Sequence, residues 1–290
     1  MYPRRRFTLA LPNGQTLALG DRTLVMGIIN VTPDSFSDGG QLLDSARAVE
    51  AGVRMVEQGA DLLDVGGEST RPGAESLGEA QERARVLPVI QGLATRVSVP
   101  ISIDTYKASI GDAALEVGAT VVNDISGLRY DPALADVVAR RRAAIVLMHT
   151  RGRPRAMYEQ ASYHDVVGEV LDELRESVAF ATGAGIPSDR IIVDPGLGFA
   201  KEATHTFEAL AHLEAFSELG RPVLAGPSRK SFLARPLGGA VPAAERDWAT
   251  AAAVTAAVLA GAHIVRVHAV PEMVHVVRVA DEIRKYDANR

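Results

Sequence analysis

The sequence contains no cysteine, and this absence removes several kinds of chemistry at once. Without thiols the chain can form no disulfide scaffold, no zinc–thiolate site and no cysteine nucleophile. It also has no excess of basic residues, since 36 aspartates and glutamates outnumber 31 lysines and arginines and give a net charge of −5. The pI near 5.8 means that no basic field attracts phosphates. We therefore expect no binding to nucleic acid.

Long hydrophobic runs are missing as well. The alanine-rich run Ala249–Ala262 is shorter than the ~20 apolar residues that a membrane-spanning helix needs, and a buried helix is the better interpretation. Near the N-terminus, the basic run Arg4-Arg5-Arg6 precedes an apolar segment that Pro12 and Gly14 interrupt too early for the core of a secretory signal. The sequence therefore predicts a cytoplasmic protein without a membrane span.

The apolar residues that are present gather in eight short runs. Hydrophobic residues make up 47% and charged residues 23% of the 290 positions, which is typical of a globular protein with a large core. Each run is rich in valine and isoleucine and apolar on both faces, as parallel strands covered by helices should be. The runs are Leu24–Val31, Leu62–Gly67, Ile101–Asp104, Val121–Ile125, Ile145–His149, Ile191–Asp194, Val223–Gly226 and Ile264–His268.

Longer amphipathic stretches alternate with these runs and predict helices. Leu42–Gln58 and Val166–Ala181, for example, place apolar residues three or four positions apart. Several glycines lie at or near the expected helix ends, where a left-handed residue commonly terminates a helix. They are Gly52, Gly59, Gly118 and Gly261.

Eight strand–helix units in roughly 250 residues, with no linker between them, predict a closed (β/α)8 TIM barrel. An open doubly wound sheet is the alternative, but its glycine-rich phosphate fingerprint is absent from the segment Gly27-Ile-Ile-Asn-Val-Thr. Ahead of the barrel, Phe7–Leu11 and Thr16–Leu19 predict a β-hairpin around the turn Pro12-Asn13-Gly14. We expect a single domain over residues 1–290, with a hairpin at about 7–20 that closes the N-terminal end of a barrel at about 24–285.

Polar residues lie where the predicted strands end, and in a barrel all of these positions face one mouth. They are Asn30, Glu68–Arg71, Asp104, Asn123, Asp124, His149, Asp194, Ser228–Lys230, Arg266 and His268. Capping of the next helix is an equally good explanation for any single Asp or Asn. It does not explain Lys230, Arg266 and His268, because cations are disfavoured at helix N-termini. As a set, these side chains suit a polar heterocycle that carries an anion.

The first two strand-to-helix connections add a second signal. Residues 30–40 and 66–73 are rich in Gly, Ser and Pro, and they also contain Phe36, Arg71 and several acids. Plain surface connectors would explain the Gly and Pro but not the other residues. Loops of this composition often close over a site.

These segments together resemble the dihydropteroate synthase family, from about Leu24 to His268. The matching segments are Asn30-Val-Thr-Pro-Asp-Ser-Phe-Ser-Asp-Gly-Gly, Asp64-Val-Gly-Gly-Glu-Ser-Thr-Arg-Pro-Gly, Ser102-Ile-Asp-Thr, Val122-Asn-Asp-Ile-Ser-Gly, Leu147-Met-His, Asp194-Pro-Gly-Leu-Gly-Phe, Ser228-Arg-Lys-Ser and Arg266-Val-His. The first two segments are long and specific, whereas the shortest would carry little weight alone.

The resemblance implies a role for each matching site residue. It implies that the pterin pocket is formed by Asp104, Asn123, Met148, Asp194 and Lys230. It places Asn30 at Mg²⁺ and pyrophosphate, and Arg266 and His268 at the pyrophosphate end. The p-aminobenzoate site would come from two mobile loops, with the residues Phe36, Asp38, Thr70, Arg71 and Pro72, and from Ser231, which would hold the carboxylate. The implied catalytic set is Asn30, Asp38, Arg71, Asp104, Lys230, Arg266 and His268.

The implied reaction condenses 6-hydroxymethyl-7,8-dihydropterin pyrophosphate with p-aminobenzoate to give 7,8-dihydropteroate, in a Mg²⁺-dependent homodimer that sulfonamides inhibit. In the family, pyrophosphate leaves before the amine attacks, so no enzyme nucleophile is needed. Two positions depart from the family pattern: Ala269 replaces a common Asp, and Ala200 replaces a common Gly in what we interpret as a conservative loop change. A pterin-binding methyltransferase and a non-catalytic pterin-binding paralogue are the alternative functions.

Overall fold

The computed structural model describes residues 4–31, 40–69, 76–153 and 157–287. In this part of the chain, eight parallel strands form one sheet in the order β8-β7-β6-β5-β4-β3-β10-β9. They are β3 (Leu24–Asn30), β4 (Leu62–Gly66), β5 (Ile101–Asp104), β6 (Val121–Asp124), β7 (Ala144–Met148), β8 (Ile191–Asp194), β9 (Leu224–Ala225) and β10 (Ile264–Val267). The sheet closes into a barrel where Val193 bridges to Val223 and donates to Pro222 O over 3.0 Å.

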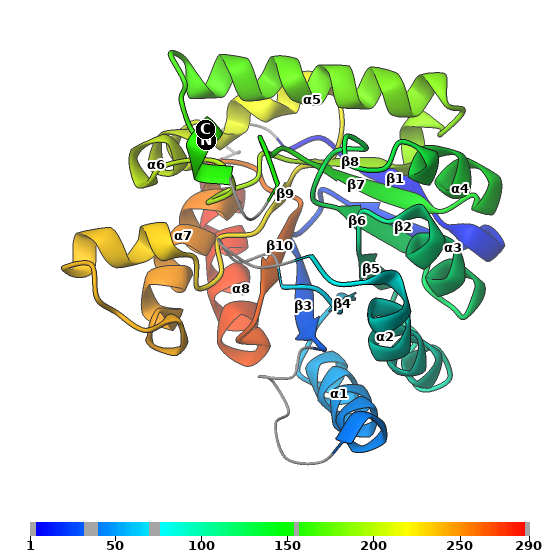
Figure 1. Cartoon of the computed structure of the whole chain (residues 1–290). Coiled ribbons are helices and arrows are strands. Elements are labelled where there is room, and N and C mark those ends of the chain that lie inside the picture. The colour runs from blue at the N-terminus through cyan, green and yellow to red at the C-terminus, as the bar shows by residue number, and fades with distance from the viewer. Residues whose placement is uncertain (1–3, 32–39, 70–75, 154–156, 288–290) are drawn as a thin grey trace.

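Helices alternate with the strands and surround the barrel (Figure 1). They are α1 (Gly40–Glu57), α2 (Glu79–Ala94), α3 (Ala108–Glu116), α4 (Ala133–Arg141), α5 (Val166–Gly183), α6 (Ala203–Ala211), α7 (Asp247–Leu259) and α8 (Val270–Asp287). Short 3-10 turns are η1 (Pro12–Gly14), η3 (Met157–Gln160), η4 (Ser188–Arg190), η5 (Leu213–Leu219), η6 (Ser231–Leu237) and η7 (Ala243–Glu245). The predicted (β/α)8 barrel is confirmed, and the doubly wound alternative is excluded.

Every barrel strand except β5 contributes to two separate apolar layers, because successive side chains point to opposite faces. In β7, Ile145 and Leu147 pack outward against the helices, whereas Ala144 and Val146 point into the barrel. Burial on both faces explains why the strands are apolar throughout rather than alternating with polar residues.

The N-terminal hairpin closes the end of the barrel at which the strands begin, as predicted. Its strands β1 (Phe7–Ala10) and β2 (Thr16–Leu19) pair antiparallel around η1. Leu9, Leu11 and Leu19 are buried against the inward-facing residues of the barrel strands. The hairpin therefore closes this end with apolar side chains, and an active site is expected at the opposite end of the barrel.

The glycine predictions are correct at three positions and wrong at one. Gly59, Gly118 and Gly261 follow helices with φ of 102°, 123° and 100°, in the left-handed region. Gly52 instead lies inside α1, where an added Cβ would lie 2.7 Å from Leu93 Cδ2. Close packing of α1 on its neighbours, and not helix termination, requires glycine there.

The alanine-rich run forms α7, a helix packed on the barrel as predicted. Thr250, Ala253, Val254, Ala257 and Val258 form its buried face. Among the described residues, none of the helices is both long and apolar enough to cross a bilayer.

Candidate active site

The barrel interior becomes polar at the carboxyl ends of the strands. Side chains two positions apart on a strand share a face, so the residues beyond the inner apolar layer also point inward. These residues are Asp64, Asp104, Asn123, Met148, Asp194 and Arg266. The last inward-facing position of most strands is therefore polar, and the barrel brings these positions together in one ring.

Most of this ring lines one narrow cavity at the mouth of the barrel. The lining residues are Asp104, Asn123, Ile125, Met148, Asp194, Leu197, Phe199, Gly226, Lys230 and Arg266. All five residues that the sequence assigns to a pterin pocket are among them, together with Arg266. Ile125, Leu197, Phe199 and Gly226 were not predicted, although Phe199 and Leu197 stand in the segment that follows Asp194.

Arg266 lies between two buried carboxylates. Its Nη2 donates to Asp104 Oδ2 over 2.7 Å, and its Nε donates to Asp64 Oδ2 over 2.6 Å. Burial raises the pKa of Asp104, and Arg266 offsets only part of this effect while Asp64 adds to it. Burial alone would lower the pKa of Arg266, but the two carboxylates outweigh it. Arg266 is thus a fixed cation at the base of the cavity.

Asp194 and Lys230 also line the cavity. Asp194 Oδ1 accepts a hydrogen bond of 2.7 Å from Gly196 N, and burial raises the pKa of its carboxyl to about 6. Burial lowers the pKa of Lys230 to about 7, and its Nζ lies 3.5 Å from the centroid of the Phe199 ring. The cavity therefore offers acceptors, a donor and a flat aromatic surface within the space of one ring system.

Asp64 is a functional candidate that the sequence did not identify. It is completely buried in β4, and Oδ2 accepts from Asn123 Nδ2 over 3.0 Å as well as from Arg266. It therefore orients two lining residues without lining the cavity itself. The available signal was a carboxylate inside the apolar run Leu62–Gly67, since a buried acid is rare unless it is paired.

His268 and Ser228 form a pair beside Arg266. The distance from His268 Nδ1 to Ser228 Oγ is 2.8 Å, and the same hydroxyl accepts from His268 N over 3.1 Å. Burial, and then the charge of Arg266, lower the pKa of His268 to about 3. The ring is therefore neutral near pH 7 and can supply a hydrogen bond rather than a positive charge.

Asn30 and Ser231 lie outside the lined cavity, and their contacts with pyrophosphate and p-aminobenzoate stay predictions. Asn30 is the half-buried last residue of β3 and is paired with Gly66 of β4. Ser231 is exposed at the start of η6, immediately after Lys230. Among the described residues, no group of three or more His, Asp or Glu side chains could hold a metal ion.

Further strand-end residues are bound away from the cavity, so the expectation that the whole ring converges was wrong for them; they are Glu68, Asp124, His149 and Arg229. Asp124 turns back and accepts from Ser126 N and Leu128 N over 2.8 and 2.6 Å, and so stabilises the turn that follows β6 rather than capping α4. His149 points outward toward α5, where Glu173 lies 3.2 Å from its Nε2. The remaining predicted residues Phe36, Asp38, Thr70, Arg71 and Pro72 lie outside the described residues, and their places in the site stay predictions.

Ala200 corrects another sequence interpretation. It is completely buried and has φ of 46°, in the left-handed region that favours glycine. The replacement of a common glycine at this position is therefore not conservative, because any Cβ in this conformation is strained.

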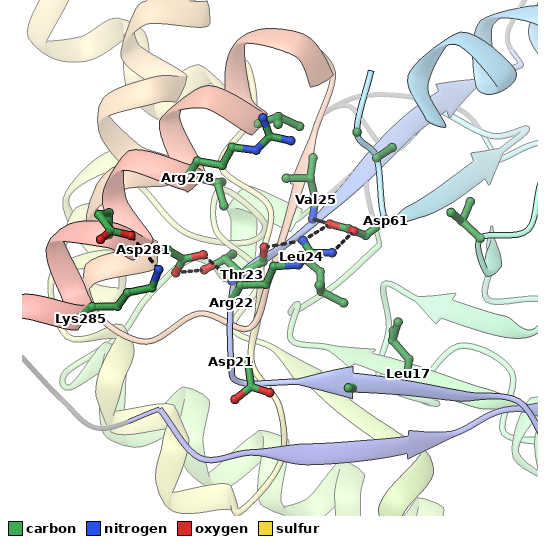
Figure 2. A pocket seen from close by; sticks show the side chains of 17 residues that line it. Leu17, Asp21, Arg22, Thr23, Leu24, Val25, Asp61, Arg278, Asp281 and Lys285 are labelled. Atoms are coloured by element: carbon green, nitrogen blue, oxygen red, sulfur yellow. Dashed lines mark hydrogen bonds and ion pairs between the residues drawn. The ribbon is translucent and has the colours of Figure 1, made fainter. Parts of the chain in front are cut away.

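A larger cavity of about 950 Å³ lies at the other end of the barrel, between the hairpin and α8 (Figure 2). Most of its charged residues are paired: Arg22 binds Asp61, Lys285 binds Glu282, and Asp281 accepts from Thr23 N over 2.6 Å. Size alone favours this cavity, but its lining does not gather the strand-end polar residues that line the smaller one. The smaller polar cavity is therefore the candidate active site.

Known proteins are similar to this chain along most of its length. Residues 26–268 match the family described as pterin binding enzyme. A dihydropteroate synthase of Synechocystis sp. is 45% identical over 278 residues, which cover 96% of each chain.

Two solved structures have the same fold. A Yersinia pestis dihydropteroate synthase in complex with a sulfonamide drug has a TM-score of 0.89 and 37% identity, covering 96% of this chain and all of that one (100%). A Xanthomonas albilineans dihydropteroate synthase with 4-aminobenzoic acid has a TM-score of 0.87 and 43% identity, covering 96% and 99% of the two chains. The barrel, the polar cavity at its mouth and these relatives together show that the chain belongs to the dihydropteroate synthase family of pterin-binding enzymes.

Proposed function

We propose that the chain catalyses the condensation of 6-hydroxymethyl-7,8-dihydropterin pyrophosphate with p-aminobenzoate to give 7,8-dihydropteroate and pyrophosphate. The observation that carries this proposal is the buried cavity in which Asp104, Asn123, Asp194, Lys230 and Arg266 surround a flat apolar surface. Few ligands other than a polar bicyclic heterocycle would use all of these groups.

The carboxylates and the amide suit the donor-rich edge of a pterin. Asp194 and Asn123 would accept from ring N–H and amino groups, and Lys230 would donate to a ring nitrogen or carbonyl oxygen. Phe199 and Met148 would contact the faces of the ring. Because these groups are buried, each hydrogen bond discriminates strongly against a ring that lacks the matching atom.

The leaving group would meet the cationic side of the site. The bond between the pterin methylene carbon and the pyrophosphate oxygen breaks, and its electron pair leaves with pyrophosphate. Arg266 would stabilise the departing charge, and neutral His268 would add a hydrogen bond. The amine nitrogen of p-aminobenzoate then bonds to the methylene carbon and loses a proton. No side chain has to act as a nucleophile.

Mg²⁺ fits the residues at the mouth if the substrate provides most of its ligands. Asn30 offers one amide oxygen beside the predicted pyrophosphate position, and Mg²⁺ prefers oxygen ligands from phosphates and water. When bound, the ion would neutralise charge on the leaving pyrophosphate. Ser231, next to Lys230, would hold the carboxylate of p-aminobenzoate at the exposed end of the site.

We also propose that the protein is a homodimer and that α7 and α8 form its interface. These two helices pack side by side (Figure 1), and both carry large apolar side chains that are exposed. Trp248 is 90% exposed, and Val279, Ile283 and Tyr286 are exposed as well. Exposed apolar groups at such a density indicate a contact with another protein surface.

A steady-state assay tests the proposed reaction. With both substrates and Mg²⁺, we expect equal amounts of dihydropteroate and pyrophosphate, and we expect chelation of Mg²⁺ to abolish turnover. Lys230→Met should abolish activity, whereas Lys285→Met, an exposed lysine bound only to Glu282, should not. Sulfonamides should compete with p-aminobenzoate and not with the pterin. Tight pterin binding without product would indicate a non-catalytic paralogue, and methyl transfer would indicate the methyltransferase alternative.

A further inference from the structure

Lys201 is among the largest completely buried side chains of the described residues, yet it does not line the active-site cavity. Lysine is rarely buried, because removal of its ammonium group from water is costly unless the group is bound. In the part of the chain that the structure describes, Lys201 takes part in none of the ion pairs. Burial lowers its pKa to about 7, and the charges of Asp194 and Glu173 oppose that change. A buried lysine that forms no described ion pair therefore calls for a structural or functional explanation.

The hydrogen bonds of Lys201 join two connections behind the cavity. Its Nζ lies 2.8 Å from His149 Nδ1, directly after β7. It also donates to Gly196 O and Phe199 O over 3.3 and 3.2 Å, within the connection that follows β8. Lys201 therefore holds the turn between Asp194 and itself against the end of β7.

The turn held by Lys201 carries three lining residues of the cavity: Asp194, Leu197 and Phe199. Its backbone has no regular pairing and passes through the left-handed region at Gly196, Gly198 and Ala200, with φ of 68°, 76° and 46°. A backbone of this kind keeps its shape only where surrounding groups hold it.

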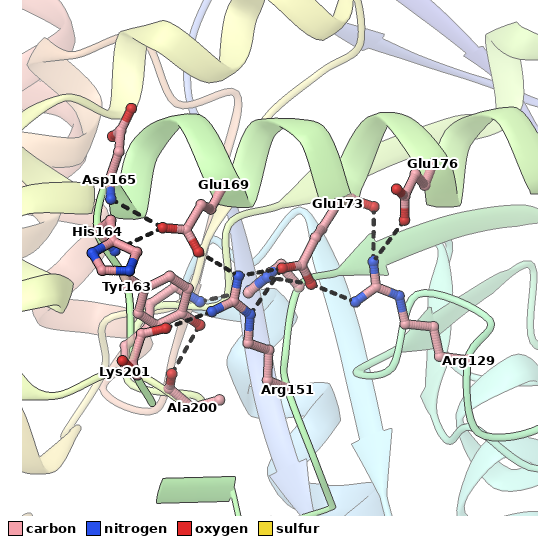
Figure 3. Close-up of polar contacts among 12 residues, drawn as sticks. Arg129, Arg151, Tyr163, His164, Asp165, Glu169, Glu173, Glu176, Ala200 and Lys201 are labelled. Atoms are coloured by element: carbon pink, nitrogen blue, oxygen red, sulfur yellow. Dashed lines mark hydrogen bonds and ion pairs between the residues drawn. The ribbon is translucent and has the colours of Figure 1, made fainter. Parts of the chain in front are cut away.

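A polar network completes the support (Figure 3). His149 is neutral, because burial and the charge of Lys201 lower its pKa to about 3. Its Nδ1 can then accept from Lys201 while Nε2 donates to Glu173 over 3.2 Å. Arg151 binds Glu173 and lies over the Tyr163 ring, whose hydroxyl donates to Ala200 O over 2.9 Å. The network therefore contacts the turn after β8 twice, through Lys201 at one end and through the Tyr163 hydroxyl at the other.

We propose that Lys201 is a positioning residue for pterin recognition, which holds the carbonyl groups of Gly196 and Phe199 and thereby fixes the Asp194 carboxylate and the Phe199 ring in the cavity. This inference rests on the proposed function. It predicts a defect confined to the pterin: small displacements of binding groups can cost a factor of up to about 100 in rate. The p-aminobenzoate site, which lies elsewhere, should keep its affinity.

Lys201→Met tests the proposal, because methionine fills similar space without donors or charge. We expect the Kd for pterin pyrophosphate, measured by calorimetry, to rise roughly tenfold or more. The KM for p-aminobenzoate at saturating pterin should stay within about twofold of the wild type. Arg129→Met is the matched control: Arg129 binds Glu173 from the outside over 2.7 Å, so its loss should lower thermal stability and leave pterin affinity unchanged.

An unchanged pterin Kd in Lys201→Met, or an equal loss of affinity for both substrates, would overturn the proposal. If that variant does not fold, Tyr163→Phe decides, since it removes only the hydrogen bond to Ala200 O. A severalfold rise in its pterin Kd supports the proposal, and an unchanged Kd contradicts it. A wild-type protein that binds no pterin would instead refute the proposed function, and the inference with it.

Discussion

At the residue scale, the cavity is built from charged groups that are costly to bury. Asp194 shows the conflict most clearly, because Gly196 N gives the only described hydrogen bond to its carboxylate, and burial raises its pKa from 3.8 to about 6. We propose that the pterin binds this carboxylate, so that the group lowers stability in the unliganded protein and contributes to binding.

Asp194→Asn should weaken pterin binding by about 2–3 kcal/mol, because the amide presents a donor where the ring also presents one. In the wild type, affinity should fall as the pH is lowered through about 6, since protonation removes the same acceptor. Calorimetry across this pH range measures both effects. The charged groups that face Asp194 are Lys230, Arg266 and Lys201. Unchanged affinity in the variant, or the same pH dependence in both proteins, would refute the assignment of Asp194 to the pterin.

The same substitution should stabilise the unliganded protein. Because the folded-state pKa of Asp194 is raised, its contribution to stability is complete below the unfolded pKa of 3.8 and is lost as the pH rises through about 6. At pH 7 the variant avoids this loss, which is of the order of 2–3 kcal/mol.

Ala200 allows a second prediction at this scale. With φ of 46°, its Cβ is strained, and glycine would relieve that strain. Ala200→Gly should therefore raise the free energy of unfolding by about 1 kcal/mol, measured by chemical denaturation. Ala135→Gly is the control, because Ala135 is buried inside α4 and glycine should there lower stability by about the same amount or more. A destabilised Ala200→Gly would mean that packing of the methyl group outweighs the backbone strain.

At the scale of elements, the hairpin and the barrel strands meet in a core far from the chemistry. Leu9→Ala removes a side chain that is 1% exposed, and we expect a loss of about 2–5 kcal/mol in the free energy of unfolding. The pterin Kd of the folded protein should not change. Thr8→Ala, on the exposed face of the same strand, should alter stability by less than about 0.5 kcal/mol. A raised pterin Kd in Leu9→Ala would show that the hairpin also affects the structure of the polar cavity.

Elements were easier to predict from the sequence than the contacts between them. The valine- and isoleucine-rich runs located every barrel strand, because burial on both faces leaves a strong local pattern. β9 is the shortest strand, since Pro222 and Pro227 flank it and neither has an N–H to donate. The prediction of a helix end at Gly52 was wrong, because glycine is needed there to make room for a side chain of α2. No local sequence pattern reveals such a contact.

The same distinction explains the site. Strand-end polarity located Asp104, Asn123, Asp194, Lys230 and Arg266, because the barrel brings all strand ends to one mouth. The direction of a side chain after the last strand residue is set by tertiary packing. His149 therefore turns away to Lys201 and Glu173, although the sequence placed it with the other strand-end residues.

At the scale of the whole molecule, the two ends of the barrel and its outer surface have separate tasks. One end is closed by apolar packing, and the other carries the polar cavity. The outer surface of α7 and α8 belongs to neither end, yet it exposes Trp248, Val279 and Ile283. Exposed groups of this size are costly in a monomer, which is why we place the dimer contact there.

Trp248 is the only tryptophan of the chain, so it reports directly on this surface. If two copies join through α7 and α8, its fluorescence at high concentration should be shifted to shorter wavelengths and should move to longer wavelengths on dilution. Trp248→Lys should sediment as a monomer of 30.8 kDa, because a charge placed at the centre of an apolar contact remains unpaired. Phe180→Lys on α5, which replaces a side chain that is 48% exposed, should leave the association state unchanged. A dimer that survives Trp248→Lys, or fluorescence that does not depend on concentration while sedimentation shows dissociation, would place the interface on another surface.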